Sequence, residues 1–258
     1  EDPEIKNPTL KNTEIQGNIE FKNVSFTYPE TKIKALNKIS FTLKKGETIG
    51  LLGKVGSGKS TLAELICRIN DPDMGGIYIG GKNIKNVNLN CLRNAIGYVP
   101  QEAFLFSDSI YNNIAFGKKQ SKEQEVISAA KEADIFNNIQ NLKKGFQTII
   151  GERGVTLSGG QKQRLSIARA LIRKPEFMLF DDCLSAVDTK TEELILQNIK
   201  ENFKEKSCLI ISHRASSIRH ADLILVLHDG EILEQGSHDN LMQWKGEYFR
   251  TYQKQLVE

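Results

Sequence analysis

A glycine-rich stretch, residues 53–60, constrains what this chain can fold into more than any other feature. In chain order it consists of Gly53, Lys54, Val55, Gly56, Ser57, Gly58, Lys59 and Ser60, and Thr61 follows it. Apolar residues over 48–52 predict a strand before it, and the pattern over 59–68 predicts a helix after it. Glycines in such a loop let backbone N–H groups wrap around a phosphate at the helix N-terminus. The stretch therefore predicts a phosphate-binding loop (P-loop), with Lys59 reaching the β- and γ-phosphates of a nucleotide and Ser60 ligating Mg²⁺.

A second element of such a site follows later in the chain. Residues 177–180 are apolar, and Asp181 comes directly after them. A buried strand that ends in a carboxylate fits the second magnesium-coordinating element of P-loop proteins. The pattern alone is weak, because many apolar strands end in aspartate. After a P-loop, it predicts Asp181 as a magnesium ligand.

The apolar patterns predict an α/β fold with a P-loop core. Continuous apolar runs over 177–180 and 208–211 are typical of strands buried on both faces of a parallel sheet. Alternation over 19–26 predicts a half-buried strand, which we place in an N-terminal antiparallel β subdomain. Between about 102 and 174 the pattern becomes helical, which predicts an inserted helical subdomain.

Three smaller features complete the expected organisation. Residues 229–230 are Asp-Gly between two apolar runs, which predicts a β-hairpin. Residues 1–18 are polar and contain two prolines, which predicts a linker ahead of one domain over 19–258. Residues 248–256 predict a short helical tail.

The composition excludes several classes of function. With 35 basic and 32 acidic residues, the net charge is only +3, so no strong field for nucleic acid or anionic lipid is expected. The four cysteines lie far apart, which argues against a zinc site or a disulfide framework and favours a reducing cytosol. No apolar run approaches the roughly 18 residues of a membrane helix. We therefore expect no nucleic-acid partner, and a membrane part would be absent from this chain.

The segment Leu157-Ser158-Gly159-Gly160-Gln161 separates this chain from other P-loop proteins, which include kinases, GTPases and helicases. Ser158 is a good N-cap for a helix predicted over 159–172, and the glycines leave backbone donors accessible. The segment is thus a second helix N-terminus suited to an anion. With its continuation to Leu171 it resembles the signature of ATP-binding cassette (ABC) ATPases. The resemblance extends from about residue 19 to the end of the chain.

The resemblance implies further site residues. Tyr28 resembles the aromatic residue that stacks on adenine, with a core tyrosine as the alternative. Gln101 resembles the Q-loop glutamine that touches Mg²⁺ and the attacking water, and Asp188 resembles the D-loop aspartate that links two sites. His213 resembles the switch histidine that holds the γ-phosphate. The signature segment is implied to contact ATP held by a second nucleotide-binding domain, so that two Mg-ATP lie between two subunits.

Asp182 departs from the family pattern, in which a glutamate normally follows the magnesium-site aspartate and polarises the attacking water. Aspartate is one methylene shorter, which withdraws the carboxylate by roughly 1.5 Å. Because a misplacement of about 1 Å can cost on the order of a hundredfold in rate, we expect slow hydrolysis at this site. A second departure is Ile149, in a segment that resembles the exporter X-loop, where exporters usually carry a glutamate. Both favour the degenerate half of a heterodimeric exporter, with a homodimer that tolerates aspartate as the alternative.

The segment 102–114, which follows the Q-loop glutamine, resembles the corresponding segment of ABC exporters more than that of ABC importers. Phe104, Leu105 and Phe106 are costly to expose, and we expect them to line the groove that receives a coupling helix of the membrane domain. Packing inside the helical subdomain is the alternative. We expect the transmembrane domain to be fused to this domain in the full-length protein, which would lie on the cytoplasmic face of a cell membrane, such as the bacterial inner membrane.

The expected function is an ATP-hydrolysing motor domain that drives export. One alternative is an ATP-binding dimerisation module with an impaired catalytic site. The other is a non-transport ABC ATPase of DNA repair or translation. DNA-repair members insert a long coiled coil, which is not present, and translation members carry two cassettes where this chain has one.

Overall fold

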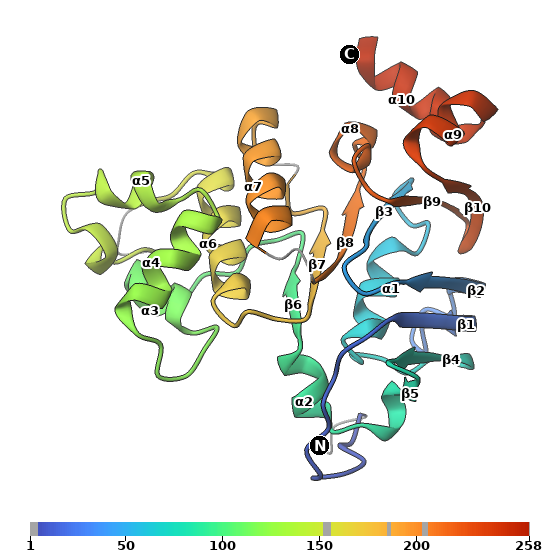
Figure 1. Ribbon diagram of the computed structural model, residues 1–258, viewed down its shortest axis with the longest axis horizontal. Helices are drawn as coiled ribbons and strands as arrows, with labels where there is room; N and C mark the ends of the chain where they lie inside the picture. Colours follow the sequence, from blue (N-terminus) through green and yellow to red (C-terminus); the bar gives the residue numbers. More distant parts are fainter. Residues whose placement is uncertain (1–4, 152–155, 185–186, 203–205, 258) are drawn as a thin grey trace. The chain divides into compact units, whose positions relative to one another are not determined.

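The computed structural model describes residues 5–151, 156–184, 187–202 and 206–257 (Figure 1). The chain forms two compact units. The first unit spans residues 1–98, 176–181 and 205–258, and the second spans 99–175 and 182–204. None of the described helices is both long enough and apolar enough to cross a bilayer.

Two sheets form most of the first unit. The strands are β1 (Ile19–Thr27), β2 (Lys34–Leu43), β3 (Thr48–Gly53), β4 (Met74–Ile79), β5 (Lys82–Asn83), β6 (Ile96–Val99), β7 (Phe177–Asp181), β8 (Ser207–Ser212), β9 (Leu223–His228) and β10 (Glu231–Gly236). One sheet has four antiparallel strands in the order β2-β1-β4-β5. The other has six in the order β10-β9-β3-β8-β7-β6, and its central strands β9, β3, β8 and β7 are parallel. The fold class predicted from the apolar patterns is therefore confirmed.

The buried strands explain why the core forms. Every residue of β7 and β8 is buried, as the continuous apolar runs predicted. In β2 the residues Ile39, Phe41 and Leu43 alternate with exposed positions, so this face of the antiparallel sheet is buried. Phe41 also stacks on Phe21 of β1, with ring centroids 4.6 Å apart. Both sheets contribute to one hydrophobic cluster of the first unit.

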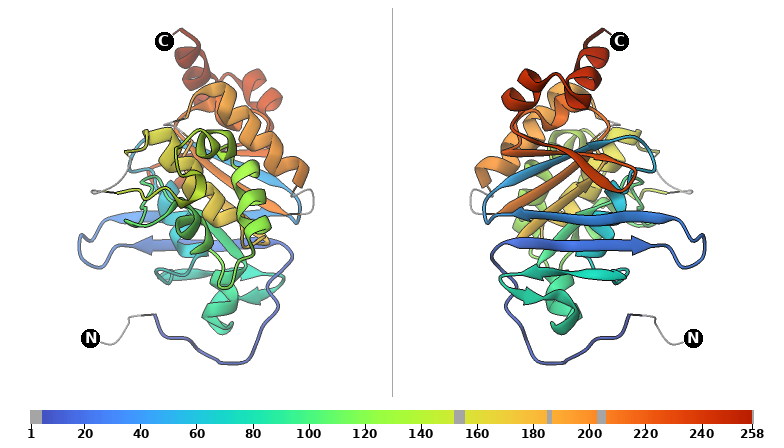
Figure 2. Two further views of the ribbon diagram at one scale, coloured as in Figure 1. Left: turned by 90° about the vertical axis from the view of Figure 1, so that its left-hand side faces the viewer. Right: turned by 90° about the vertical axis from the view of Figure 1, so that its right-hand side faces the viewer.

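The helices, including two 3₁₀ helices labelled η, follow the strands in both units. They are α1 (Lys59–Ile66), η1 (Ile84–Asn86), α2 (Leu89–Asn94), α3 (Ile110–Ala115), α4 (Glu123–Glu132), α5 (Phe136–Gln140), η2 (Gly145–Gln147), α6 (Gly159–Leu171), α7 (Thr189–Asn202), α8 (Ala215–Ile218), α9 (His238–Trp244) and α10 (Glu247–Val257). In the first unit, α1 contacts β3 and β7, and α10 contacts α8 and α9 (Figures 1 and 2). In the second unit, α6 packs against α3 and α4. Helix α1 ends two residues before the predicted position, because Arg68 adopts a left-handed backbone conformation with φ 51°.

The predicted hairpin at the end of the six-stranded sheet is confirmed. Strands β9 and β10 are antiparallel neighbours. Their turn residues Asp229 and Gly230 have φ values of 46° and 79°, as a two-residue turn with two left-handed positions requires. The linker over 1–18 and the limits of the inserted helical subdomain remain predictions.

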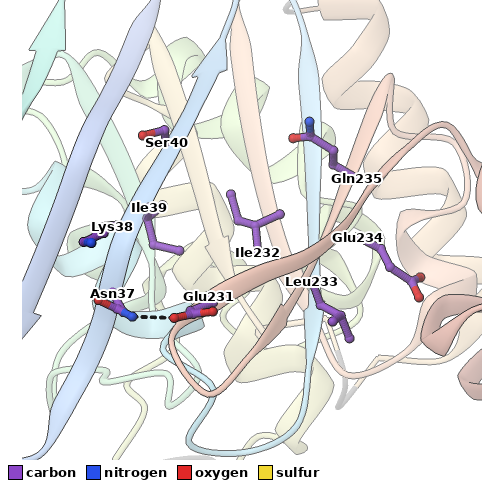
Figure 3. Close-up of a pocket in the computed structure, with 9 residues that line it drawn as sticks. All are labelled: Asn37, Lys38, Ile39, Ser40, Glu231, Ile232, Leu233, Glu234 and Gln235. Carbon is purple, nitrogen blue, oxygen red and sulfur yellow. Dashed lines mark hydrogen bonds between the residues drawn. The ribbon is translucent and has the colours of Figure 1, made fainter.

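The edge strands β2 and β10 border a cavity of about 540 Å³ in the first unit (Figure 3). The side-chain amide of Asn37 donates a hydrogen bond to the carboxylate of Glu231 across this region, and the Asn37 N–H donates to the carbonyl of Gly230 at 2.8 Å. These bonds connect the edges of the two sheets. None of the predicted site residues lines this cavity.

Candidate functional site

The predicted P-loop connects β3 to α1 in the first unit, as its sequence requires. Gly56 and Gly58 adopt left-handed conformations, with φ values of 82° and 97°. A Cβ atom on Gly58 would lie 2.4 Å from the carbonyl oxygen of Ala35, so only glycine fits there. Gly58 is also the N-cap of α1 and has no side chain that caps the helix. The first turn of α1 therefore presents backbone N–H groups that suit an anion.

Lys59 places a positive charge inside this loop. The side chain is buried, and its Nζ donates hydrogen bonds to the carbonyls of Gly53 and Lys54, at 2.7 and 2.8 Å. The Ser57 hydroxyl lies 3.5 Å from the same nitrogen. The loop thus supplies polar partners that offset the cost of burying the ammonium group. The loop therefore holds a buried positive charge, which suits an anionic phosphate.

Two of the three predicted magnesium ligands, Ser60 and Asp181, meet in the first unit, and the third, Gln101, belongs to the second unit. Asp181, the last residue of β7, is buried, and its Oδ1 accepts a hydrogen bond of 3.0 Å from the Ser60 hydroxyl. Among the described residues, no group of three or more His, Cys, Asp or Glu side chains could hold a metal ion. A hydroxyl and one carboxylate suit Mg²⁺, which keeps several waters and binds through few protein oxygens together with substrate phosphates. The donor set therefore fits magnesium.

Tyr98 is a neighbour of this site that the sequence patterns did not reveal. Its hydroxyl donates to Oδ2 of Asp181 at 3.1 Å, so each carboxylate oxygen of Asp181 accepts one hydrogen bond. Burial, and next the charge of Asp181, raise the pKa of Tyr98, so the phenol stays a proton donor. The sequence shows only that Tyr98 lies in a short apolar run two residues before Pro100. Such a run does not indicate which other strand its side chains face, so the contact with Asp181 could not be predicted.

Tyr28 directly follows β1, and its side chain contacts α1. Its hydroxyl pairs with the Thr61 hydroxyl at 2.9 Å and donates to Glu64 at 3.0 Å. The ring makes an edge contact with Phe26, with centroids 5.0 Å apart, and is half-buried against the hydrophobic cluster. Burial raises the pKa of Tyr28. The side chain is therefore adjacent to the P-loop helix but also takes part in the core, and adenine stacking stays a prediction.

His213 follows β8 and faces the same region of the first unit as the P-loop. A cavity of about 450 Å³ is lined by Gly53, Lys54 and His213, together with residues of β9 and α10. The predicted switch histidine and the beginning of the P-loop therefore border one cavity. This agrees with a shared role toward one ligand.

In the second unit, the structure brings Gln101 and Asp182 together. The Gln101 amide nitrogen lies 3.4 Å from Oδ2 of Asp182, and Asp182 is buried with a left-handed φ of 45°. The amide of Gln163, a buried residue of α6, donates to the carbonyl of Gln101. The helix that begins at the signature is thus tied to the predicted Q-loop.

The signature segment forms the N-terminus of α6 as predicted. Ser158 accepts a hydrogen bond from the Gln161 N–H at 3.3 Å, and the Ser158 N–H donates to the Gln161 side chain at 3.0 Å. This is a reciprocal capping box on an exposed helix end. Gly159 and Gly160 occupy the first two helical positions, where N–H groups have no intrahelical acceptor. The arrangement suits an anion supplied by another molecule.

Asp188 has a local structural role in the second unit. Its Oδ1 accepts a hydrogen bond from the Thr191 N–H at 3.0 Å, at the start of α7. Hydrogen bonding by Thr191 lowers the pKa of Asp188. Parts of two predicted segments fall outside the described ranges. These are Ser185 and Ala186, before Asp188, and residues 152–154, the last three of the seven residues (148–154) that resemble the X-loop. Ile149 of that segment is described and is 47% exposed.

Comparison with known proteins identifies the class. The family model described as ABC transporter matches residues 36–185. The chain belongs to the ABC transporter family. Its fold is that of the nucleotide-binding domain of an ABC exporter: it matches the structure of a bacterial Atm1-family ABC exporter with ATP bound, with a TM-score of 0.91 and 40% identity over 98% of this chain and 44% of that chain.

Curated relatives of the chain are also ABC transporters. The chain is 47% identical, over 93% of its length, to the probable multidrug resistance ABC transporter ATP-binding/permease protein YheI of Bacillus subtilis (strain 168). It is 44% identical, over 99% of its length, to the ATP-dependent lipid A-core flippase of Haemophilus influenzae (strain 86-028NP). The chain spans 41% and 44% of the length of these two relatives.

Proposed function

We propose that this chain binds Mg-ATP at the P-loop and hydrolyses it between two nucleotide-binding domains, and that this drives export of a substrate across a membrane. The observation that carries the proposal is the meeting of Lys59, Ser60 and Asp181 around one loop. Lys59 is buried inside the loop, and Ser60 is bonded to Asp181. Family membership and the ATP-bound structural neighbour support ATP as the nucleotide.

Each residue then has a role that follows from its chemistry. Lys59 and the N–H groups of α1 bind the phosphates, while Ser60 and Asp181 hold Mg²⁺. When bound, Mg²⁺ neutralises charge on the phosphate oxygens. Gln101 and Asp182 orient the attacking water, and His213 contacts the γ-phosphate. Ser158 and the glycines after it bind the nucleotide held by the other domain.

We propose that hydrolysis at this site is slow and that the partner is a different chain. Asp182 supports this, because its shorter side chain withdraws the carboxylate from the position that a glutamate would reach. The intact signature would complete a competent site on a partner that carries the glutamate. A second candidate function, an ATP-binding dimerisation module without turnover, rests on the same residue.

We also propose a membrane-domain contact for the aromatic cluster of Phe104, Phe106 and Phe116 in the second unit. Phe104 and Phe116 are 66% and 67% exposed, and Phe106 packs against both rings. Arg169 of α6 lies over the rings of Phe106 and Phe116 and donates to the carbonyl of Phe104 at 2.6 Å. Exposed aromatic surface of this kind favours a protein partner. The two relatives named above, an ATP-binding/permease protein and a flippase, support a transmembrane domain as that partner. We propose the cytoplasmic face of a membrane as the location.

Steady-state and single-turnover ATP hydrolysis by the 258-residue chain test the proposed function. We expect a slow, magnesium-dependent release of phosphate that increases when a partner domain with the glutamate is added. Binding of Mg-ATP without any hydrolysis, even in a single turnover with that partner present, would instead support the binding-only module.

A further inference from the structure

Helix α10 contacts α8, which begins two residues after His213 in the sequence (Figures 1 and 2). The contact is made by the side-chain amide of Gln255. Its Nε2 donates a hydrogen bond to the carbonyl of His213 at 2.7 Å, and its Oε1 accepts one from the N–H of Ala215 at 2.8 Å. The side-chain amide of Gln255 thus binds the backbone at two positions, His213 and Ala215.

The N-terminus of α8, which follows His213, needs a hydrogen-bond acceptor from outside the helix. Ala215 is the first residue of α8, which has only four residues. The N-cap position is Arg214, whose side chain makes no capping hydrogen bond. The first N–H groups of a helix have no intrahelical acceptor, so the Gln255 oxygen takes the place of a capping side chain.

Only an amide matches the two backbone groups. The His213 carbonyl needs a donor and the Ala215 N–H needs an acceptor, and a glutamine side chain offers both at once. A carboxylate keeps the acceptor but sets a negative oxygen against the His213 carbonyl. A thioether of similar length offers neither of the two strong bonds.

The same helix borders the cavity in front of the P-loop. Arg250, Thr251 and Gln255 of α10 line it together with Gly53 and His213. A shift of the His213 backbone therefore changes where the imidazole stands relative to the P-loop, within the first unit.

We propose that Gln255 is a positioning residue for His213, whose amide fixes the backbone that presents the imidazole to the nucleotide. This inference rests on the proposed function, in which His213 contacts the γ-phosphate. Because Gln255 itself contacts no nucleotide in this account, its loss affects turnover more than ATP binding.

The test compares Gln255→Met and Gln255→Glu with a matched control, Gln253→Met, which changes an exposed glutamine of the same helix. Three quantities are measured on the whole chain: kcat for ATP, KM for ATP, and the hydrogen-exchange rate of the Ala215 amide by NMR. We expect both Gln255 variants to lower kcat roughly tenfold, with KM changed less than about twofold. We expect the Ala215 amide to exchange roughly tenfold faster in both variants. In Gln255→Met the amide loses its acceptor, and in Gln255→Glu repulsion between the carboxylate and the His213 carbonyl displaces the acceptor. The control should match the wild type in all three quantities.

Unchanged exchange at Ala215 in Gln255→Met would overturn the proposal, as would faster exchange with an unchanged kcat. An equal rise in KM and fall in kcat/KM would assign Gln255 to ATP binding instead, and would also overturn it. If the wild type hydrolyses no ATP, the proposed function fails and the positioning role with it. The exchange rate of the Ala215 amide would then still show whether Gln255 hydrogen-bonds to this backbone.

Discussion

The Ser60 hydroxyl donates a hydrogen bond of 3.0 Å to Oδ1 of Asp181, across 121 positions of sequence. Ser60 belongs to the first turn of α1, and Asp181 ends β7, which α1 contacts. The strand and the helix thus deliver two oxygen ligands to one point beside the P-loop.

Ser60→Ala and Asp181→Asn each remove one magnesium ligand. We expect each to lower magnesium-dependent ATP hydrolysis by about a hundredfold, because the charge on the phosphates is no longer neutralised at a fixed point. The measurement is the rate of phosphate release as a function of Mg²⁺ concentration. Ser128→Ala, on an exposed face of α4, is the control. A magnesium response in Ser60→Ala equal to that of the wild type would contradict the assignment.

Tyr98→Phe removes the hydrogen bond to Oδ2 of Asp181 and keeps the ring. A hydrogen bond to a charged group is worth about 1.5–3 kcal/mol, so the orientation of Asp181 should loosen. We expect the Mg²⁺ concentration at half-maximal activity to rise by roughly tenfold. Tyr111→Phe is the matched control, because its hydroxyl bonds to the Ser121 carbonyl in the second unit. An equal shift in both variants would show that the effect is not specific to Asp181.

The sequence predicted the parts of the site that depend on local chemistry. The P-loop, the strand before it and the helix after it follow from glycine positions and apolar patterns within about 20 residues. The signature segment likewise predicted its own helix end, since Ser158 and Gln161 are the two halves of one capping box. Such features need no knowledge of distant segments.

Contacts between distant segments could not be predicted in this way. Tyr98 meets Asp181, and Gln255 meets His213, only because separate elements pack against one another. The pattern of a single strand or helix does not specify its neighbour. Strand β4 was missed for a local reason, because Gly75 and Gly76 interrupt the alternation that marks a strand.

Asp182→Glu restores the side-chain length that is usual in the family. We expect kcat for ATP to rise by roughly tenfold to a hundredfold, because the carboxylate then reaches the attacking water. Asp182→Asn, which keeps the length and removes the charge, should lower kcat further. The measurement is single-turnover hydrolysis of Mg-ATP with each variant. Equal and rapid hydrolysis by Asp182→Glu and the wild type would remove the idea of an impaired site.

Gly58→Ala should destabilise the fold. Alanine at a left-handed position costs roughly 1–2 kcal/mol, and its Cβ would also lie 2.4 Å from the Ala35 carbonyl oxygen. Gly81→Ala is the matched control, because Gly81 has a φ of 77° and open space around its Cβ. In chemical denaturation, we expect Gly81→Ala to lose only the conformational cost and Gly58→Ala to lose at least about 1 kcal/mol more. Equal losses would mean that the loop can move away from Ala35.

The most direct test is the affinity of the chain for Mg-ATP, measured by titration with the wild type and with Lys59→Ala. Lys59 is a buried cation held inside the P-loop by the carbonyls of Gly53 and Lys54. Loss of a charge-assisted bond to phosphate corresponds to about 1.5–3 kcal/mol, so Kd should rise by roughly ten- to a hundredfold. Saturable binding by the wild type and this loss in Lys59→Ala are the predicted results. Equal affinity in the two proteins, or no binding by the wild type, would contradict the account.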